Sequence, residues 1–368
     1  MQLISNTSRV RVSALSAGLR EMSVVNLLGL ITAAYISLGI IYLIALGDNP
    51  IEVFQSFVFA FPQFIALAML LVPAWALVLL CVGFVWLCRI RNMDLGKLRE
   101  VMVAIVYCTV FTFMFSLVKN KLPLVNSFWA DPMFTELDKM LHFGMNPRDF
   151  LEWLSFASTR NLSTFYFNGW VFFATYLPVL LVAFDTSKQR ARTFTLLWAA
   201  CWVVLGNFIA VVFMSAGPIF AGLLPSISPS DHAAVMGMLA RDDASMLHSV
   251  RDVLWHAYAE DQSQAASGIS AFPSVHVGMA TVVGLYILRL GRDLQTVLPA
   301  APLRHVVRVT SCLASVVIVG VFMVLSVYLG WHYAVDGYAS VVVMTGLYWM
   351  MQRRVQRDSA FFGQAYAA

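Results

Sequence analysis

The chain has 368 residues, of which 60% are hydrophobic and only 12% are charged. A soluble domain of this length does not need so many apolar residues for its core. The composition therefore indicates an integral membrane protein and excludes an ordinary soluble enzyme. The net charge of +4 requires no nucleic-acid partner, because the basic excess flanks apolar segments.

Apolar runs of about 20 residues, the length that crosses the hydrocarbon of a bilayer, recur along the chain. We predict an all-α, polytopic membrane bundle with about eight transmembrane helices. The predicted spans are residues 23–46, 62–88, 100–118, 168–185, 194–214, 273–290, 307–328 and 333–352. Only a few residues separate the last two spans, so the sequence leaves open whether they are separate helices. The first span is longer than the apolar core of a signal peptide, and we expect it to be retained.

These spans divide the chain into four predicted parts. Residues 1–118 form N-terminal transmembrane helices, and residues 119–167 form a loop that contains an amphipathic helix. Residues 168–352 form a transmembrane core that includes a second long loop, 215–272, and residues 353–368 form a tail. Long loops over a membrane site usually act as lids or binding walls.

Basic residues gather on one side of the predicted membrane. Seventeen of the 24 lie in the termini or between alternate spans: Arg9, Arg11, Arg20, Arg89, Arg91, Lys97, Arg99, Lys188, Arg190, Arg192, Arg289, Arg292, Arg304, Arg308, Arg353, Arg354 and Arg357. Residues 215–272 instead hold six acidic residues against Arg241 and Arg251. Because basic flanks stay in the cytoplasm, we expect cytoplasmic termini and outward-facing loops 119–167 and 215–272 in a plasma membrane.

The five cysteines lie inside or at the edges of apolar spans. They are Cys81, Cys88, Cys108, Cys201 and Cys312. We interpret them as small buried hydrophobic residues, because their spacing matches neither a disulfide framework nor a zinc site.

Two short motifs put a histidine at a predicted membrane boundary. They are Ser270-Ala-Phe-Pro-Ser-Val-His276 and Tyr328-Leu-Gly-Trp-His332-Tyr-Ala-Val-Asp336. Asp336 follows His332 by four residues, so on a helix the carboxylate lies on the same face and can fix the imidazole tautomer. Pro273 and Ser274 are typical of a helix start, whose unpaired N–H groups favour an anion. Together these residues predict a phosphoryl-transfer site.

The chemistry of such a site assigns a role to each catalytic candidate. We predict that His332 attacks phosphorus and that Asp336 accepts a hydrogen bond from its other ring nitrogen. His276 is the predicted general acid for the leaving group, and then the base for the incoming water or alcohol.

The predicted substrate-binding residues lie beside the two motifs or in the loops. Ser274 and the N–H groups that follow Pro273 are expected to cradle phosphoryl oxygens, with Ser270 in the same turn. Loop cations can add positive charge, and the candidates are Lys119, Lys121, Arg148, Arg160, Arg241 and Arg251.

Other interpretations of these residues stay open. A histidine at a helix end also serves as a cap, and two histidines with a carboxylate also match a metal site. We expect no metal or cofactor, because the Pro-Ser helix start suits an oxyanion better. Asp138 and His142, four residues apart, are interpreted as a solvated helix face. Ordinary solvated positions are also expected for His232, His248, His256 and His305.

At its two motifs the chain resembles the type 2 phosphatidic acid phosphatase (PAP2) superfamily. The second motif of that family is Pro-Ser-x-His and the third ends in His-x-x-x-Asp, which Pro273 to His276 and His332 to Asp336 match. The resemblance extends over about residues 100–352. It implies a helical membrane core and metal-independent transfer through a phosphohistidine, with a phospholipid or polyprenyl phosphate as substrate.

Two departures from the family pattern concern the substrate. Phosphatases of the family carry Lys-x6-Arg-Pro as their first motif and an arginine six residues before the third-motif histidine. Here Ser215-Ala-Gly-Pro-Ile-Phe220 and Ser326 stand at these places. A phosphodiester carries one negative charge where a monoester carries nearly two, so a site with fewer cations fits a diester better.

The chain is therefore more similar to the branch that contains inositol phosphorylceramide synthase, an inositolphosphotransferase. We expect a phosphotransferase that passes a phosphorylated headgroup from one lipid to another alcohol on the outer side of the membrane. A lipid or polyprenyl phosphate phosphatase is the alternative. A non-enzymatic lipid transporter is an alternative of another class. It would need charged or Gly/Pro-broken positions at mid-span, and the predicted spans are nearly free of charge.

Overall fold

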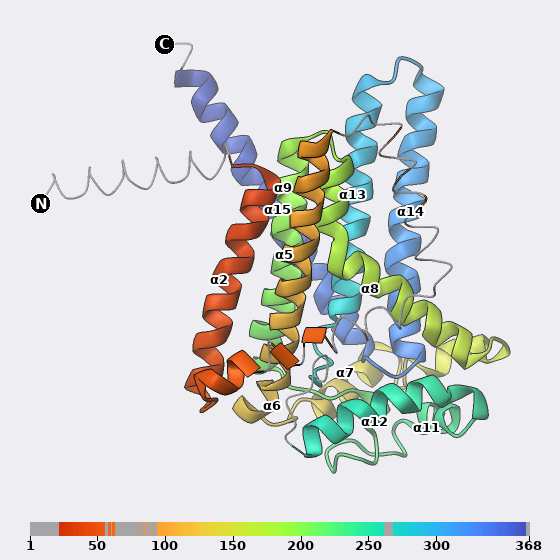
Figure 1. Cartoon of the computed structure of the whole chain (residues 1–368). Helices are drawn as coiled ribbons and strands as arrows, with labels where there is room; N and C mark the ends of the chain where they lie inside the picture. Colours follow the sequence, from red (N-terminus) through yellow and green to blue (C-terminus); the bar gives the residue numbers. More distant parts are fainter. Residues whose placement is uncertain are drawn as a thin grey trace, which may run out of the picture.

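The computed structural model describes residues 22–55, 58–59, 61–62, 82, 85, 89, 94–260 and 268–365. This part of the chain is helical, and no β-strand occurs in it. Long helices stand side by side as a bundle, and short helices form a layer across one end (Figure 1). We call this layer the loop layer.

The long helices confirm the predicted helical membrane bundle. Five segments within the described residues are long and apolar enough to cross a membrane: Val24–Ala45, Leu95–Val125, Thr159–Phe184, Lys188–Val212 and Ala301–Tyr328. The long helices of the bundle are α2 (Val24–Ala45), α5 (Leu95–Asn120), α8 (Thr159–Phe184), α9 (Lys188–Ala200), α13 (Val275–Val297), α14 (Ala301–Tyr328) and α15 (Ala334–Ala365). Most of the predicted span 62–88 lies outside the described residues, so the number of eight spans stays a prediction.

The helix that starts with α9 continues to Val212 through a π-helical turn. The turn is η2 (Cys201–Ile209), and α10 (Ala210–Val212) follows it. A π-helix has a wider turn than an α-helix and often occurs near functional sites. Here it places the Trp202 ring against Trp170 of α8, with 5.6 Å between the ring centroids.

A sharp break separates α14 from α15, which the sequence alone left open. Gly330 in this break has a φ of +76°, a conformation that glycine adopts without strain. A Cβ at this position would also lie 2.6 Å from the Val235 side chain. The chain therefore turns tightly against a neighbouring helix and re-enters the bundle as α15.

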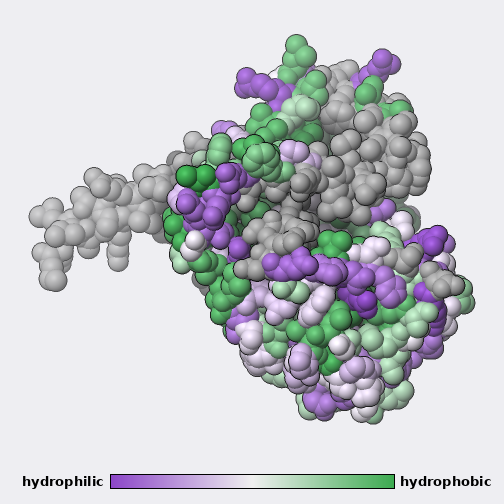
Figure 2. All heavy atoms as spheres, turned by 60° about the horizontal axis from the view of Figure 1, so that its bottom comes forward, coloured by the Kyte–Doolittle hydropathy of each residue, from purple (hydrophilic) through white to green (hydrophobic). Residues whose placement is uncertain are grey.

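The two long loops form the loop layer together, at the same end of the bundle (Figure 1). Its elements are α6 (Leu122–Val125), α7 (Asp131–Leu141), η1 (Asp149–Phe156), η3 (Pro218–Phe220), α11 (Ala233–Leu239), η4 (Asp242–Ala244) and α12 (Ser245–Ala259). Hydrophilic side chains are spread over this end among hydrophobic ones (Figure 2). The first loop is shorter than predicted, because α8 begins at Thr159 and not near residue 168.

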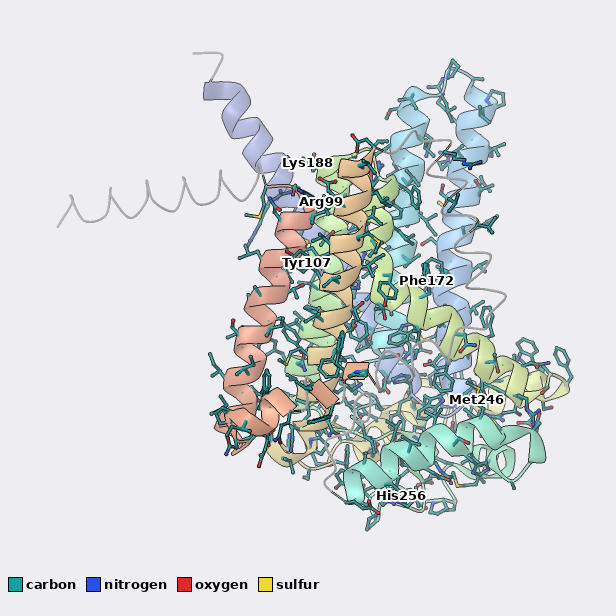
Figure 3. The ribbon with its side chains drawn as sticks, in the orientation of Figure 1. Arg99, Tyr107, Phe172, Lys188, Met246 and His256 are labelled. Carbon is teal, nitrogen blue, oxygen red and sulfur yellow. The ribbon has the colours of Figure 1, made fainter. Side chains whose placement is uncertain are left out.

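Basic residues of the predicted cytoplasmic flanks lie at the end of the bundle away from the loop layer (Figure 3), although the loop layer itself holds Lys139, Arg148, Arg241 and Arg251. Figure 3 shows Arg99 and Lys188 at this end, whereas Met246 and His256 lie in the loop layer at the other. The turn between α13 and α14 also lies far from the loop layer (Figure 1). The fold therefore has the separation of charge on which the predicted orientation depends.

The orientation predicts which end reacts with an impermeant thiol reagent in intact cells. Ala259 is exposed at the end of α12, and Ala300 is exposed between α13 and α14. In a variant without native cysteines, Ala259→Cys should be labelled because basic flanks keep the opposite end in the cytoplasm. Ala300→Cys should be labelled only after the cells are opened. The reverse pattern would invert the topology.

Candidate active site

His332 lies in the break between α14 and α15, with one ring nitrogen held by two acceptors. Its Nδ1 is 2.8 Å from the carbonyl oxygen of Ala271 and 3.2 Å from Oδ2 of Asp336. Since both partners are acceptors, Nδ1 carries the proton and Nε2 keeps its lone pair. Burial, with repulsion from Lys119 as a smaller cause, lowers the pKa of His332 to about 3. The imidazole is therefore neutral at ordinary pH.

Asp336 lies in the first turn of α15 and is fully buried. Its Oδ2 also accepts the N–H of Tyr333 at 3.0 Å. Its carbonyl oxygen accepts the N–H of Ser274 at 3.2 Å, and the Ser340 hydroxyl donates to the carbonyls of both Ser274 and Asp336 at 2.8 Å. These bonds join the start of α13 to the start of α15, so the two motifs that carry the histidines are held together.

His276 lies in the first turn of α13, close to His332. The centroids of the two imidazoles are 5.7 Å apart. Ser274 is the N-cap of α13, and its Oγ accepts the N–H of Val277 at 3.3 Å, as expected of a serine at a helix start. The fold thus brings together all three predicted catalytic side chains.

Part of the predicted phosphate-binding site already forms hydrogen bonds within the protein. The hydroxyl of Ser274 caps α13, and its N–H donates to Asp336, so both groups already have partners. Pro273 is buried beside it. The carbonyl oxygen of Ser270 accepts a hydrogen bond from Nζ of Lys119 at 3.4 Å. Ser270 therefore holds a cation, and its role toward a substrate stays a prediction.

Lys119 is the predicted cation that the structure brings to the histidines. Its ammonium donates to the carbonyl oxygen of Ser270, in the motif that carries His276, and its positive charge disfavours the charged form of both histidines. Lys121 instead pairs with Asp48 at 3.4 Å. The other candidates also have partners: Arg148 and Arg241 pair with Glu152, Arg251 pairs with Asp252, and Arg160 interacts within the chain.

Asp138 has a structural role, which corrects the prediction that it lies on a solvated helix face. Its side chain is buried rather than solvated, and it accepts the N–H groups of Ala334 and Val335 at 2.8 and 3.0 Å. It therefore caps α15 from another helix. Burial raises the pKa of Asp138 to about 6, against the lowering effect of the two N–H donors. His142 bonds to the carbonyl oxygen of Asp138 and to the Tyr338 hydroxyl, so it does not pair with the carboxylate.

Asp131, at the start of α7, binds the segment that stands in the place of the first motif. It accepts the N–H groups of Ala216 and Gly217 at 2.9 to 3.0 Å and the Tyr333 hydroxyl at 3.0 Å. Gly217 has a φ of +100°, and a Cβ there would lie 2.6 Å from the carbonyl oxygen of Trp331. This contact could not be predicted from local sequence, because 85 and 86 residues separate Asp131 from its N–H donors.

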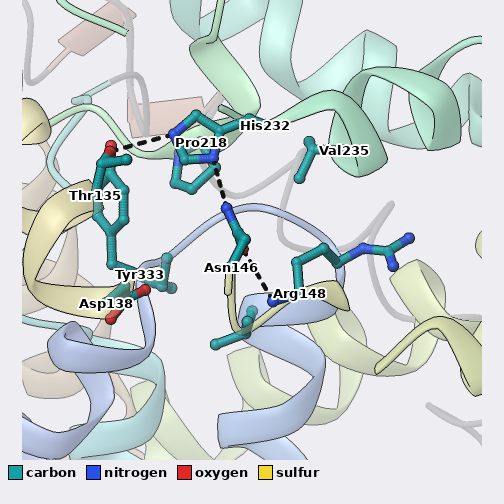
Figure 4. A pocket seen from close by; sticks show the side chains of 10 residues that line it. Thr135, Asp138, Asn146, Arg148, Pro218, His232, Val235 and Tyr333 are labelled. Atoms are coloured by element: carbon teal, nitrogen blue, oxygen red, sulfur yellow. Dashed lines mark hydrogen bonds between the residues drawn. The ribbon is translucent and has the colours of Figure 1, made fainter. Parts of the chain in front are cut away.

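His232 is buried, which corrects the expectation of a solvated position. Its Nε2 is 3.3 Å from Oγ1 of Thr135, and its Nδ1 is 3.3 Å from Nδ2 of Asn146 (Figure 4). Burial lowers the pKa of His232 to about 4, so the ring is neutral and both nitrogens are satisfied within the fold. Of the other three histidines with an expected solvated position, His256 and His305 are exposed as predicted. His248 is half-buried and bonds to the carbonyl oxygen of Leu239.

A small cavity beside His332 connects these polar residues. It is lined by Thr135, Asp138, Asn146, Arg148, Pro218, His232, Val235, Val327, His332 and Tyr333. The guanidinium of Arg148 points away from His232 and Asn146 (Figure 4), and it stacks on the Tyr328 ring with 4.2 Å to the centroid. Within the described ranges, no group of three His, Cys, Asp or Glu residues is placed to hold a metal ion.

The cap on α15 predicts the effect of removing Asp138. Asp138→Ala leaves the N–H groups of Ala334 and Val335 unpaired, and each buried, unpaired donor costs about 1–3 kcal/mol. We expect a lower melting temperature in detergent and a loss of any activity that depends on His332. Glu136→Ala is the matched control, because Glu136 lies on the same helix but is exposed. Equal melting temperatures for both variants would show that the cap does not stabilise the site.

The comparison with known proteins agrees with this geometry. No curated protein and no solved structure matches the chain. Residues 132–350, more than half of the chain, match the family model of the PAP2 superfamily. The matched range contains His276, His332 and Asp336, and it starts after Lys119. With both histidine motifs in this range and a helical membrane bundle around them, the chain belongs to the PAP2 superfamily.

Proposed function

We propose that the protein is a membrane lipid phosphotransferase that acts through a phosphohistidine at His332. It transfers a phosphorylated headgroup from one lipid to the hydroxyl of another at the outer face, as inositol phosphorylceramide synthase does. One observation carries the proposal. Nδ1 of His332 is bonded to Ala271 and Asp336, so a neutral Nε2 is left to attack phosphorus.

In the first step Nε2 of His332 forms a bond to phosphorus, and the bond from phosphorus to the leaving oxygen breaks. The leaving oxygen takes the electron pair of that bond and a proton from the His276 imidazolium. The phosphorylated ring of His332 keeps its Nδ1 proton and is positive, so the buried carboxylate of Asp336 stabilises it. The products of this step are the released lipid alcohol and the phosphohistidine.

In the second step the hydroxyl oxygen of the acceptor attacks phosphorus and gives its proton to His276. The bond from phosphorus to Nε2 breaks, and its electron pair returns to His332. Both histidines are then in the state in which they started. Water in place of the lipid alcohol turns the same two steps into hydrolysis, so the phosphatase alternative differs only in the acceptor.

Charge favours a phosphodiester substrate. Of the loop cations predicted to bind phosphate, Lys119 is the one whose charge acts on both histidines, and it lies in a buried setting. Ser326 stands at the place of the family arginine, is fully buried, and donates its hydroxyl to the carbonyl of Met323. In the reacting state Lys119 and the His276 imidazolium are positive and the Asp336 carboxylate is negative, so a diester with one negative charge makes the site neutral, whereas a monoester leaves it negative.

The nucleophile assignment predicts the effect of His332→Ala. This variant should lose turnover of a labelled phospholipid and also the acid-labile phosphoryl label that the parent protein retains after quenching. His256→Ala, a change at an exposed histidine, should keep both. A chelator should leave the rate of the parent unchanged. If EDTA stops the reaction and added metal restores it, a metal site replaces the phosphohistidine mechanism.

The charge argument predicts substrate preference. With a long-chain alcohol as acceptor, the parent should transfer from a phosphodiester lipid with a higher kcat/KM than it hydrolyses phosphatidic acid or a polyprenyl phosphate. Lys119→Met should lower kcat/KM for the diester by about 10- to 100-fold, because hydrogen bonds to charged groups contribute about 1.5–3 kcal/mol. Lys97→Met, at the other end of the bundle, is the control. Faster hydrolysis of a monoester by the parent would make the phosphatase the correct function.

A further inference from the structure

Two aromatic residues of α8 enclose the imidazole of His276. The Tyr166 ring stacks on it with 4.5 Å between centroids and an interplanar angle of 10°. The Trp170 ring stacks on it with 3.9 Å between centroids and an angle of 24°. Two rings cannot stack on the same face of one imidazole, so His276 is held between them. Trp170 is in turn in contact with Trp202 of the π-helical turn η2.

The enclosing residues carry polar atoms that the fold leaves unpaired. The Tyr166 side chain is fully buried, and its hydroxyl has no hydrogen-bond partner among the residues that the structure describes. The atoms Nε1 of Trp170 and Nε2 of His276 are also buried and also lack a hydrogen-bond partner among these residues. Other aromatic residues differ in this respect: the indoles of Trp198 and Trp202 both donate to the carbonyl of Ala174, whereas the hydroxyls of Tyr42 and Tyr328 are also buried without a partner among the described residues.

An unpaired buried hydroxyl destabilises a protein, so its presence needs a reason. Stacking alone does not provide one, since a phenylalanine ring would stack on His276 equally well without the hydroxyl. The neighbourhood of the Tyr166 ring does provide one. His332 lies 5.7 Å from the imidazole on which Tyr166 stacks, measured between the two imidazole centroids. A phosphoryl group attached to His332 thus brings acceptor oxygens into the region that holds this donor.

We propose that Tyr166 is a further catalytic residue, whose hydroxyl donates a hydrogen bond to a nonbridging phosphoryl oxygen during transfer. Its ring and that of Trp170 position His276 for proton transfer, so Trp170 is a positioning residue. The inference rests on the proposed function, because it assigns the hydroxyl to the phosphoryl group of that reaction. A donor fixed in a buried site before the reaction is most effective where negative charge develops in the transition state.

The test removes only the hydroxyl. Tyr166→Phe keeps the stacked ring, and Tyr42→Phe is the matched control because it also removes a buried, unpaired hydroxyl, from α2 and outside the two histidine motifs. Three quantities are measured for each purified variant in detergent: turnover of a labelled phospholipid with an alcohol acceptor, binding of orthovanadate, and the melting temperature. Orthovanadate accepts a fifth ligand as phosphorus does in the transition state, and its binding requires no turnover.

We expect Tyr166→Phe to lower kcat by about 10²-fold, the effect typical of one lost oxyanion donor, with little change in KM. Orthovanadate binding should weaken by about tenfold or more, as fits one lost hydrogen bond to a charged group. The melting temperature should stay the same or rise, because an unpaired buried hydroxyl is gone. Tyr42→Phe should leave turnover and orthovanadate binding within about twofold of the parent.

Several results would overturn the proposal. They are unchanged kcat and orthovanadate binding in Tyr166→Phe, equal losses in both variants, a parent that binds no orthovanadate, or a lower melting temperature in Tyr166→Phe. The last result would mean that the hydroxyl is bonded within the fold. If orthovanadate binding depends on Tyr166 but the parent transfers no lipid phosphate to any acceptor, the phosphoryl-binding role stands and the proposed function fails.

Discussion

Three buried aspartates hold together the loops that carry the histidines. Asp131 binds the N–H groups of Ala216 and Gly217, and Asp138 binds those at the start of α15. Asp336 binds the N–H of Tyr333 and Nδ1 of His332. Loop backbone has no helical partner for these donors, and buried donors without a partner strongly destabilise a fold. The position of His332 therefore depends on carboxylates from two different helices.

The same arrangement sets the charge of the site. Asp131 and Asp138 accept donors on both carboxylate oxygens, whereas Asp336 accepts only on Oδ2, and its buried Oδ1 has no partner among the residues that the structure describes. Lys119 bonds to the carbonyl oxygen of Ser270. His332 is neutral because burial disfavours its charged form. In the proposed reaction, a neutral His332 near the Lys119 ammonium is suited to a substrate with one negative charge. Burial of the histidine and the loss of the family arginines thus favour the same class of substrate.

The sequence predicted the parts of this site that are local in the chain. The spacing of His332 and Asp336 and the helix start at Ser274 needed only neighbouring residues, and apolar runs were sufficient for most spans. The roles of Asp138 and His232 were missed for a physical reason. Each is polar and lies in a polar segment, so periodicity predicts exposure, whereas burial comes from contacts with residues far away in the sequence. The break at Gly330 was likewise decided by tertiary packing against Val235.

Two histidines show how a structural group differs from the proposed proton donor: His232 is buried, and His276 is half-buried with a buried Nε2. Both nitrogens of His232 have partners, so its ring completes the loop layer and nothing is left to bind a ligand. His276 is held by stacking on Tyr166 and Trp170, contacts that fix a ring without using its nitrogens. Stacking therefore provides rigidity while leaving Nε2 free for proton transfer, which hydrogen bonding to the fold would prevent. In the proposed reaction the substrate binds at polar atoms that lack a hydrogen-bond partner, and the presence of a histidine alone does not identify such a place.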